Sequence, residues 1–234
     1  MLPVALIAGG LATRLKPLTE RIPKSMIEVA GRPFIDWQLR ELKCQGVEDV
    51  IICAGHLGGQ LRSYVGNGGR YGLRIQYSFD GSSQLGTGGA LKNAVALLGD
   101  YFFVIYGDSL LPIDLPPIEN FFFENERSPL MVVIRNKNKW DKSNADFREG
   151  LVLDYNKANP SKNMEFIDYG LAALPRELFV KREAETSFDL ADLYHDLSKE
   201  GKLYGYEVFD RFYEIGSMDG LKQTESYLLE RINT

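Results

Sequence analysis

The chain has 234 residues, a formal net charge of −5 at pH 7 and a sequence pI near 5.2. This acidic balance excludes bulk attraction to nucleic acid or to an anionic membrane, so neither is expected as a partner. Any phosphate site must therefore come from a local basic cluster. The length suits one domain, which can bury roughly 70–75% of the surface that its unfolded chain exposes.

The sequence also limits the cellular compartment and the metal chemistry of the protein. The opening apolar segment is too short, and too soon interrupted by a glycine pair, for a secretory signal or a membrane span, which predicts a cytoplasmic protein. Cys44 and Cys53 lie in apolar patterns, so we expect two buried free thiols rather than a disulfide. The two histidines are too scattered for a zinc site.

Apolar runs alternate with segments of helical periodicity in the first half of the chain. Strands are predicted at Val4–Ala8, Val50–Ala54, Leu73–Tyr77 and Tyr101–Tyr106, and helices at Phe34–Gln45, Leu57–Val65 and Gly86–Leu98. This order is typical of a mostly parallel sheet with helices on both faces, a three-layer, Rossmann-like α/β fold. The loops after the first and last of these strands would face one crevice at the carboxyl ends of the strands.

In the second half of the chain, the predicted strands and helices are less regularly spaced. Helices are predicted near Ile118–Asn125, at Asp189–Lys199 and from Met218, and strands at Leu130–Arg135, Leu151–Tyr155, Phe166–Ala172 and Leu203–Glu207. The polar residues 136–150 indicate a solvent-facing loop or strand turn, and Ser187 is the expected N-cap of the helix at Asp189–Lys199. No linker marks a domain boundary, so we expect one domain over residues 1–234.

A phosphate cradle is predicted after the first strand. Gly9 and Gly10 lack Cβ atoms, so successive backbone N–H groups can converge on an anion, and Arg14 and Lys24 add full positive charges. The dinucleotide fingerprint and the P-loop are both absent, and a tight structural turn is the alternative for the glycine pair alone. The residues predicted to bind a nucleoside triphosphate here are Ala8, Gly9, Gly10, Thr13 and Arg14.

From Gly9 to Pro33 the chain reads GGLATRLKPLTERIPKSMIEVAGRP. This resembles the N-terminal signature of the sugar-1-phosphate nucleotidylyltransferases, GGxGTRLxPLTxxxPKxMxxVxGxP, with Ala12 where the family has glycine. The resemblance implies transfer of a nucleotidyl group from a nucleoside triphosphate to a sugar 1-phosphate. It also implies that Arg14 holds the β- and γ-phosphates and that Lys24 bridges the α-phosphate and the sugar phosphate, with Asp108 as a third catalytic residue.

The resemblance also implies Mg²⁺ as cofactor. Asp108 follows a strand and a glycine, the setting of the family's metal-binding aspartate, although Gly-Asp alone is more often a turn. The family's second metal carboxylate lies in the pattern W/F-x-D-x-G-T, which matches residues 212–217 with Glu214 in place of aspartate. The alternative for Glu214 is a carboxylate that caps the helix starting near Ser217.

A second glycine-rich loop, QLGTGGA at residues 84–90, resembles the family's LGTxGA segment, which packs against the base. On this resemblance, Gln84 and the backbone amides of Gly88 and Gly89 complete the nucleotide site. The alternative is a purely structural turn that opens a helix.

The sugar side is assigned by resemblance alone. Residues 166–170 resemble the family's N-A-G-x-Y strand, with Asp168 and Tyr169 replacing asparagine and alanine before Gly170. The family's Glu-Lys pair aligns with Asn156 and Lys157. The residues assigned to the sugar phosphate are Lys24, Lys157, Asp168, Tyr169 and Gly170, and a strand without ligand contact is the alternative.

Residues 1–135 are thus predicted to form the nucleotide-binding part, and residues 136–234 a small sugar-binding lobe with the C-terminal helix. GTP with heptose 1-phosphate is the preferred substrate pair, because LGTGGA and YEIGS-x-x-GL look most like that branch of the family. A uridylyltransferase acting on N-acetylmuramate 1-phosphate or a hexose 1-phosphate is the first alternative. A regulatory subunit without catalysis is the second, since Ala12, Asn156 and Glu214 depart from the family pattern together. A homodimer is left open.

Overall fold

The computed structural model describes residues 1–10, 15, 18–81, 84–182 and 187–233. The strands of its main sheet are β1 (Val4–Ile7), β4 (Asp49–Ala54), β5 (Arg74–Phe79), β6 (Tyr101–Tyr106), β8 (Leu130–Arg135), β9 (Ala145–Arg148), β10 (Leu151–Tyr155), β11 (Phe166–Pro175) and β12 (Tyr204–Val208). Two short ladders pair β2 (Glu28–Val29) with β3 (Arg32–Pro33) and β7 (Ser109–Leu110) with β13 (Tyr213–Glu214).

The helices within the described ranges lie between these strands and after the last of them. They are α1 (Phe34–Cys44), α2 (Gly58–Val65), α3 (Gly86–Ala94), α4 (Leu115–Glu124), α5 (Glu177–Val180), α6 (Leu190–Lys199) and α7 (Met218–Asn233), with 3₁₀ turns at Leu18–Glu20, Lys24–Met26 and Gly69–Tyr71. In α1, buried Ile35, Leu39 and Leu42 recur at the spacing of one helix face, and this face packs on the sheet.

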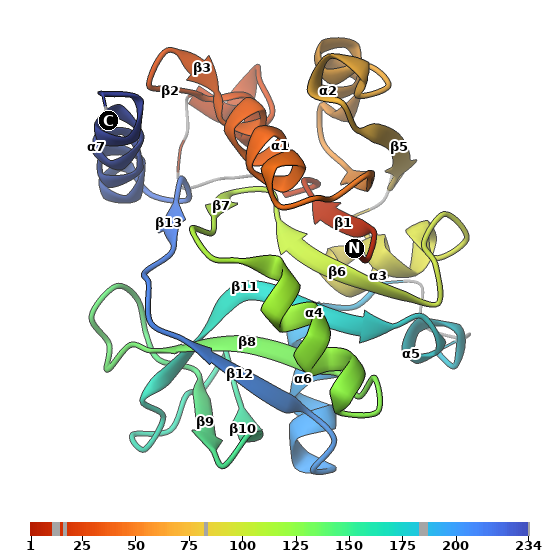
Figure 1. The fold of residues 1–234 in the computed structure, drawn as a ribbon, viewed down its shortest axis with the longest axis vertical. Helices are drawn as coiled ribbons and strands as arrows, with labels where there is room; N and C mark the ends of the chain where they lie inside the picture. The colour runs from red at the N-terminus through yellow and green to blue at the C-terminus, as the bar shows by residue number, and fades with distance from the viewer. Residues whose placement is uncertain (11–14, 16–17, 82–83, 183–186, 234) are drawn as a thin grey trace.

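The main sheet has the strand order β5-β4-β1-β6-β11-β8-β12-β10-β9 in the part of the chain that the structure describes (Figure 1). The strands β5, β4, β1 and β6 are all parallel, which confirms the sheet predicted for the first half. β11 runs antiparallel to both β6 and β8, and β10 runs antiparallel to β12 and β9. The second half therefore continues the same sheet as a mixed one.

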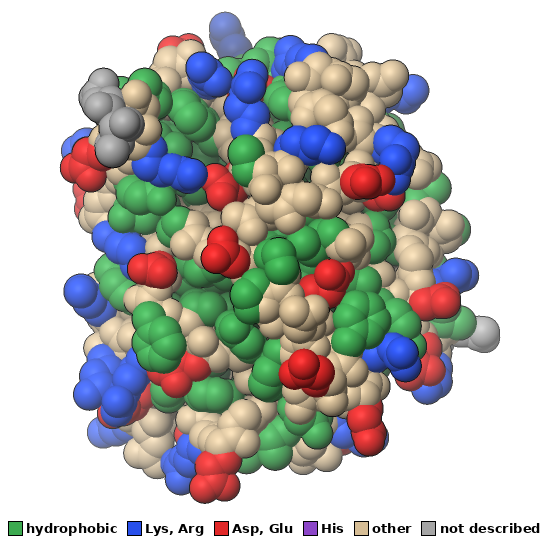
Figure 2. All heavy atoms as spheres, viewed as in Figure 1, with side chains coloured by type: hydrophobic (Ala, Val, Ile, Leu, Met, Phe, Trp, Pro, Cys, Tyr) green, Lys and Arg blue, Asp and Glu red, His purple; other side chains and the backbone are tan. Residues whose placement is uncertain are grey.

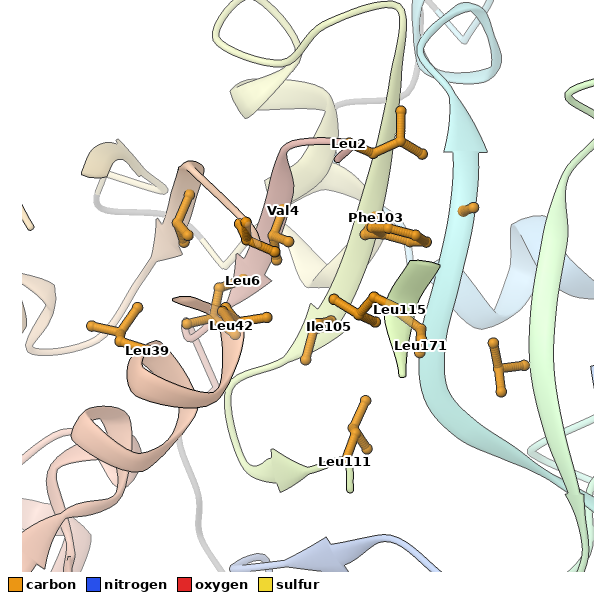
Figure 3. Close-up of a cluster of buried hydrophobic side chains, with 14 of the residues drawn as sticks. Leu2, Val4, Leu6, Leu39, Leu42, Phe103, Ile105, Leu111, Leu115 and Leu171 are labelled. Atoms are coloured by element: carbon orange, nitrogen blue, oxygen red, sulfur yellow. The ribbon is translucent and has the colours of Figure 1, made fainter. Parts of the chain in front are cut away.

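Helices cover both faces of the sheet, so the three-layer α/β fold is confirmed (Figure 1). Along β1, Val4 and Leu6 belong to one apolar cluster, and Ala5 and Ile7 belong to the other, as the two-residue repeat of a strand requires. Helices α1, α2 and α4 pack in the first cluster and α3, α5 and α6 in the second. Figure 3 shows how leucines of α1 meet side chains of β1 and β6 in the first cluster.

Two expectations about local structure were wrong, those for Cys44 and for the N-cap of α6, and the one for residues 136–150 held only in part. Cys44 is exposed, whereas Cys53 in β4 is buried as predicted. Residues 136–150 include β9, which forms a hairpin with β10 through Glu149 and Gly150, both at positive φ. The N-cap of α6 is Asp189, whose carboxylate accepts from Ala191 N at 2.9 Å, because Ser187 lies too far from the helix and bonds instead to Gln84 O at 3.1 Å.

No helix in the described ranges is long and apolar enough to cross a membrane. On the face drawn in Figure 2, lysine and arginine side chains are interspersed with aspartate and glutamate. That face therefore carries no broad basic field of the kind that nucleic acid attracts.

Candidate active site

Two cavities open at the carboxyl ends of the central strands and share a wall. The glycine-loop cavity has about 300 Å³ and is lined by Ile7, Ala8, Gly10, Lys24, Ser25, Thr87, Gly107 and Gly216, among others. The β11 cavity has about 460 Å³ and is lined by Trp140, Asp141, Asn144, Asp168, Tyr169, Gly170, Phe212 and Glu214, among others. Tyr106, Asp108 and Lys157 line both cavities. The predicted nucleotide and sugar sites are therefore adjacent.

Lys24 and Asp108 meet at the junction of the two cavities. Lys24 Nζ lies 2.5 Å from Asp108 Oδ2, and the two side chains are 15% and 34% exposed. Ser109 Oγ donates to Asp108 Oδ1 at 3.2 Å. The pair thus presents one cation and one carboxylate to the same space. The cation suits a phosphate group, and the carboxylate suits a metal ion.

Gln38 of α1 was missed by the sequence analysis, although it holds the turn that carries Asp108. Its amide nitrogen donates to Tyr106 O at 3.0 Å and to Ser109 O at 2.7 Å. Gln38 is buried. In the sequence, the only signal was a polar residue on the apolar face of a predicted helix. Two hydrogen bonds from one rigid helix restrict the position of the Asp108 carboxylate.

Glu214 lies beside Asp108 because β13 pairs with β7. Ile215 N donates to Asp108 O at 2.9 Å, which ties the two segments together. The Glu214 carboxylate accepts from Gly216 N and, at 2.7 Å, from Ser217 Oγ. A methyl group on Gly220 would lie 1.8 Å from Glu214 Oε1 and 2.8 Å from the backbone oxygen of Glu214, so any larger residue would displace Glu214 from this position at the start of α7. These contacts match the capping alternative, and the metal role of Glu214 stays a prediction.

The first glycine loop is described only as far as Gly10, so Thr13 and Arg14 lie outside the described residues. Ala8 N donates to Cys53 O at 2.8 Å and is therefore occupied, while Ala8 and Gly10 line the glycine-loop cavity. Gly9 instead packs against Gly55, where a methyl group on Gly9 would lie 3.1 Å from Gly55 N. A methyl group on Gly10 would meet no atom within 4 Å among the described residues outside its chain neighbours.

The second glycine loop is arranged differently from the expectation. Gly88 N and Gly89 N donate to Phe188 O at 3.0 and 3.2 Å, so neither amide is free to read a base in this arrangement. The side chain of Gln84 is exposed, and Thr87 is the residue of this loop that lines the glycine-loop cavity. The amides at the start of α3 are satisfied within the protein, as the structural alternative supposed.

Asp168 reaches the β11 cavity from a strand otherwise rich in apolar residues. Its carboxylate accepts from Gly170 N at 2.9 Å and is hydrogen-bonded to Tyr155. Burial raises the pKa of Asp168 to about 6, against the opposing effects of the Gly170 N–H group, the Lys157 charge and the Tyr155 hydroxyl. A carboxylate with this pKa exchanges its proton within the range of ordinary assays.

Tyr169 and Gly170 line the same cavity because the ladder between β11 and β8 is irregular. The register shifts between Asp168 and Ala172, and Gly170 has φ +90°. This bulge lets the adjacent side chains of Asp168 and Tyr169 both border the cavity, which a regular strand would not allow. The Tyr169 hydroxyl is buried and has no hydrogen-bond partner among the described residues.

Asn156 and Lys157, the aligned pair, have different roles in the structure. Lys157 lines both cavities, as expected of a residue that contacts the sugar phosphate. Asn156 Oδ1 accepts from Asn159 N at 2.8 Å and so forms a local turn instead.

An aromatic wall of the β11 cavity was also missed. Trp140 and Phe212 pack edge to face with centroids 6.2 Å apart, and Lys139 Nζ and the Arg211 guanidinium lie 4.9 and 5.4 Å from the Trp140 centroid. Trp140 stands in a polar segment that the sequence analysis assigned to solvent. A tryptophan in such a segment was the signal that could have found this wall.

Ser25 is a further missed residue, and it follows Lys24 directly. Its side chain is 3% exposed, lines the glycine-loop cavity and has no hydrogen-bond partner for its hydroxyl among the described residues. No cluster of three or more His, Cys, Asp or Glu side chains suited to a metal occurs in the described ranges. A metal ion would have to take its remaining ligands from water or from a substrate.

The chain is similar to a protein family and to several individual proteins. The sequence profile of the family described as nucleotidyl transferase matches residues 4–143. N-acetylmuramate alpha-1-phosphate uridylyltransferase of Neisseria meningitidis is 39% identical over 110 residues, which are 47% of this chain and 48% of that protein. D-glycero-alpha-D-manno-heptose 1-phosphate guanylyltransferase of Campylobacter jejuni is 27% identical over 214 residues, which are 90% of this chain and 93% of that protein.

A solved structure supports the fold. HddC from Yersinia pseudotuberculosis, complexed with GMP-PN, superimposes with a TM-score of 0.79 at 23% identity and covers 97% of this chain and 100% of its own.

Proposed function

Since the chain belongs to the nucleotidyl transferase family, we propose that it transfers a nucleotidyl group from a nucleoside triphosphate to a sugar 1-phosphate, with release of pyrophosphate. The observation that carries this proposal is the junction of the two cavities. There, Lys24 and Asp108 of the first half face Lys157 of the second, between a space for the triphosphate and a space for the sugar.

The chain's own residues supply positions and charges. An oxygen of the sugar phosphate attacks the α-phosphorus in line with the leaving pyrophosphate, and no covalent intermediate with the enzyme is required. Lys24 neutralises the oxygens of the α-phosphate and the incoming phosphate, and Lys157 orients the sugar phosphate from the opposite wall. Arg14 holds the β- and γ-phosphates of the leaving group.

The carboxylates present fit a hard divalent cation. Asp108 and Glu214 project from paired segments into one cavity, and carboxylate oxygens with added phosphate and water oxygens are the ligands that Mg²⁺ takes. Asp108 and Glu214 would hold the ion. When bound, it would neutralise charge on the triphosphate and on the departing pyrophosphate.

GTP and heptose 1-phosphate remain the preferred substrates. The Campylobacter relative named for that activity aligns over nearly the whole chain, whereas the uridylyltransferase of Neisseria aligns over about half of it. The cytoplasmic location stays a prediction from the sequence, and a homodimer stays open.

The test measures pyrophosphate release with four nucleoside triphosphates against a panel of sugar 1-phosphates, with and without Mg²⁺. We expect turnover only with Mg²⁺, and we expect Asp108→Asn to lower kcat by at least ~100-fold because an amide cannot neutralise the ion. Asp192→Asn on the exposed side of α6 is the matched control and should keep full activity. Tight binding of one triphosphate without turnover on any sugar 1-phosphate would favour the regulatory subunit instead.

A further inference from the structure

The turn that carries Asp108 is fixed to two other segments through its backbone. Gly107 N donates to Ile7 O of β1 at 2.8 Å, and a methyl group on Gly107 would also lie 2.8 Å from that oxygen, so the turn packs closely on β1. Ile215 N, directly after β13, donates to Asp108 O at 2.9 Å. The backbone at Asp108 is therefore held both by β1 and by the segment that carries Glu214.

A third attachment of this turn comes from a side chain. The amide nitrogen of Gln38 donates to Tyr106 O and to Ser109 O, and so spans the turn from the second residue before Asp108 to the residue after it. Gln38 is 3% exposed and lies in α1, whose leucines pack against β1 and β6 (Figure 3). A donor on a packed helix keeps its place relative to the sheet, so the turn is restrained from this direction as well.

The packing of α1 does not explain the amide of Gln38. Its Oε1 is buried and has no hydrogen-bond partner among the described residues. A buried, unsatisfied amide oxygen opposes folding, and an apolar side chain at this place in α1 would avoid that cost. The same change would take the donor away from two carbonyl oxygens of the turn. The amide is therefore explained by the turn that it holds.

The position of Asp108 bears on which cation the site accepts. Mg²⁺ demands nearly ideal octahedral geometry with oxygens at about 2.0–2.1 Å, whereas Ca²⁺ accepts a looser shell at about 2.3–2.6 Å. A site that favours the smaller ion must therefore hold its carboxylates firmly. The Glu214 carboxylate is restrained by Gly216 N and Ser217 Oγ, and Asp108 is restrained by its turn. Loosening this turn should cost affinity for Mg²⁺ more than affinity for Ca²⁺.

We propose that Gln38 is a positioning residue that acts through Asp108 and fits the site to Mg²⁺ rather than to a larger cation. This inference rests on the proposed function, in which Asp108 and Glu214 hold the ion. Gln38 lines neither of the two cavities as the structure describes them, so its effect on ion binding is transmitted by the turn.

The experiment measures ion binding to the protein without substrates. Binding of Mn²⁺ is followed by the loss of the electron paramagnetic resonance signal of the free ion, and Mg²⁺ and Ca²⁺ are titrated as competitors. Gln38→Met keeps the length of the side chain and removes both N–H donors. The affinity for Mg²⁺ should fall by at least ~10-fold and the affinity for Ca²⁺ by less than ~3-fold, so the ratio of the two affinities should fall by at least ~3-fold.

Gln45→Met is the matched control. Gln45 follows α1 directly, accepts from Leu115 N at 3.1 Å and donates to Glu41 Oε1 at 3.3 Å, so its side chain ties the end of α1 to α4 and not to the Asp108 turn. This variant should keep the wild-type ratio of Mg²⁺ to Ca²⁺ affinity. An equal change of the ratio in Gln45→Met would show a general loosening around α1 and would overturn the proposal.

Pyrophosphate release is measured beside ion binding, so the two proposals fail separately. A Mg²⁺-to-Ca²⁺ ratio that depends on Gln38, without turnover of any substrate pair, refutes the transferase and keeps the role of Gln38. Turnover with an unchanged ratio in Gln38→Met overturns that role, and so does a wild-type protein that binds none of the three ions.

Should Gln38→Met not fold, Gln38→Glu takes its place. A glutamate of the same length loses at least one of the two hydrogen bonds to the turn, since its carboxyl group carries one proton at most. The Mg²⁺-to-Ca²⁺ affinity ratio of this variant must also fall, and an unchanged ratio in the folded variant equally overturns the proposal.

Discussion

Lys24 and Asp108 are separated by 84 residues, yet their side chains form the charge pair at the centre of the site. Each is held from a different direction, since Asp108 sits on a turn tied to Gln38 and Lys24 sits in a 3₁₀ turn that begins after Pro23. A cation whose partner is a fixed carboxylate is oriented before any substrate arrives. This preorganisation is what electrostatic catalysis of phosphoryl-type transfer requires.

Lys24→Ala should lower kcat/KM by on the order of 10²–10⁴-fold, because Lys24 faces charge that reorganises between the ground state and the transition state. Steady-state kinetics with both substrates measures the loss. Lys202→Ala, which removes an exposed lysine paired with Glu200, is the control and should match wild type. A Lys24→Ala enzyme within threefold of wild type would exclude this role.

Asp168 provides a pH prediction. Because burial raises its pKa in the folded state to about 6, above its usual value in the unfolded chain, the folded state holds the proton more tightly between about pH 4 and pH 6. Its contribution to stability is therefore greatest below that range and is lost as pH rises through about 6. The side chain of Asp168→Asn does not titrate in this range. The free energy of unfolding of the variant, relative to that of wild type, should therefore be higher at pH 7 than at pH 4.5. Urea denaturation at both pH values checks this, and a constant difference would contradict it.

At the scale of elements, residues 187–190 close the second glycine loop. Phe188 accepts from two amides at the start of α3 and donates to Leu85 O at 3.0 Å, while Thr87 Oγ1 accepts from Leu190 N at 2.7 Å. A segment of the second half thus caps a helix of the first. The loop-to-helix turn that resembles a base-binding motif is held in this structure by contacts with residues 103 positions away in the chain.

Gly88→Ala should destabilise the protein by about 1–3 kcal/mol, because the new methyl group would lie 2.2 Å from the Phe188 ring. Adding Phe188→Ala should remove most of the steric clash that destabilises Gly88→Ala. A double-mutant cycle measured by urea denaturation should therefore show coupling between the two positions. Gly59→Ala in α2 is the control, since its methyl group would meet no neighbouring atom of the described residues within 4 Å, and it should not destabilise. Strictly additive effects of the Gly88 and Phe188 changes would contradict the packing described.

At the scale of the whole molecule, the two halves of the chain share one sheet. β6 of the first half pairs with β11 of the second over five residues from Tyr101 to Ile105, and the two cavities open beside this seam. The predicted division at residue 135 therefore falls within a continuous core, and its assignment of a binding role to each half stays a prediction. The wall shared by the cavities depends on that continuity.

We expect the two halves to unfold together, because separating them would expose both apolar clusters along β6 and β11. The two tryptophans lie one in each half, at Trp37 and Trp140. Trp37→Phe and Trp140→Phe variants should give fluorescence midpoints in urea that agree with each other and with far-UV circular dichroism. Two separated transitions would show that the halves are independent.

The local sequence pattern was sufficient to predict most of the helices and strands and to identify the residues of the signature at Gly9–Pro33. The predicted bounds of Tyr101–Tyr106, Leu130–Arg135 and Leu151–Tyr155 are confirmed, since an apolar run or alternation is readable over five or six neighbours. Family resemblance then predicted Lys24, Asp108 and Lys157 as site residues, and the fold brings these three to one junction.

Hydrogen-bond partners were decided by the tertiary structure. Sequence spacing did not reveal that the amides of Gly88 and Gly89 bond to Phe188 or that Gln38 holds the Asp108 turn. Periodicity is a property of neighbouring residues, whereas the satisfaction of a buried polar group depends on which distant segments pack around it. The chemistry of this site depends on such groups, and only the packed sheet with its covering helices determines them.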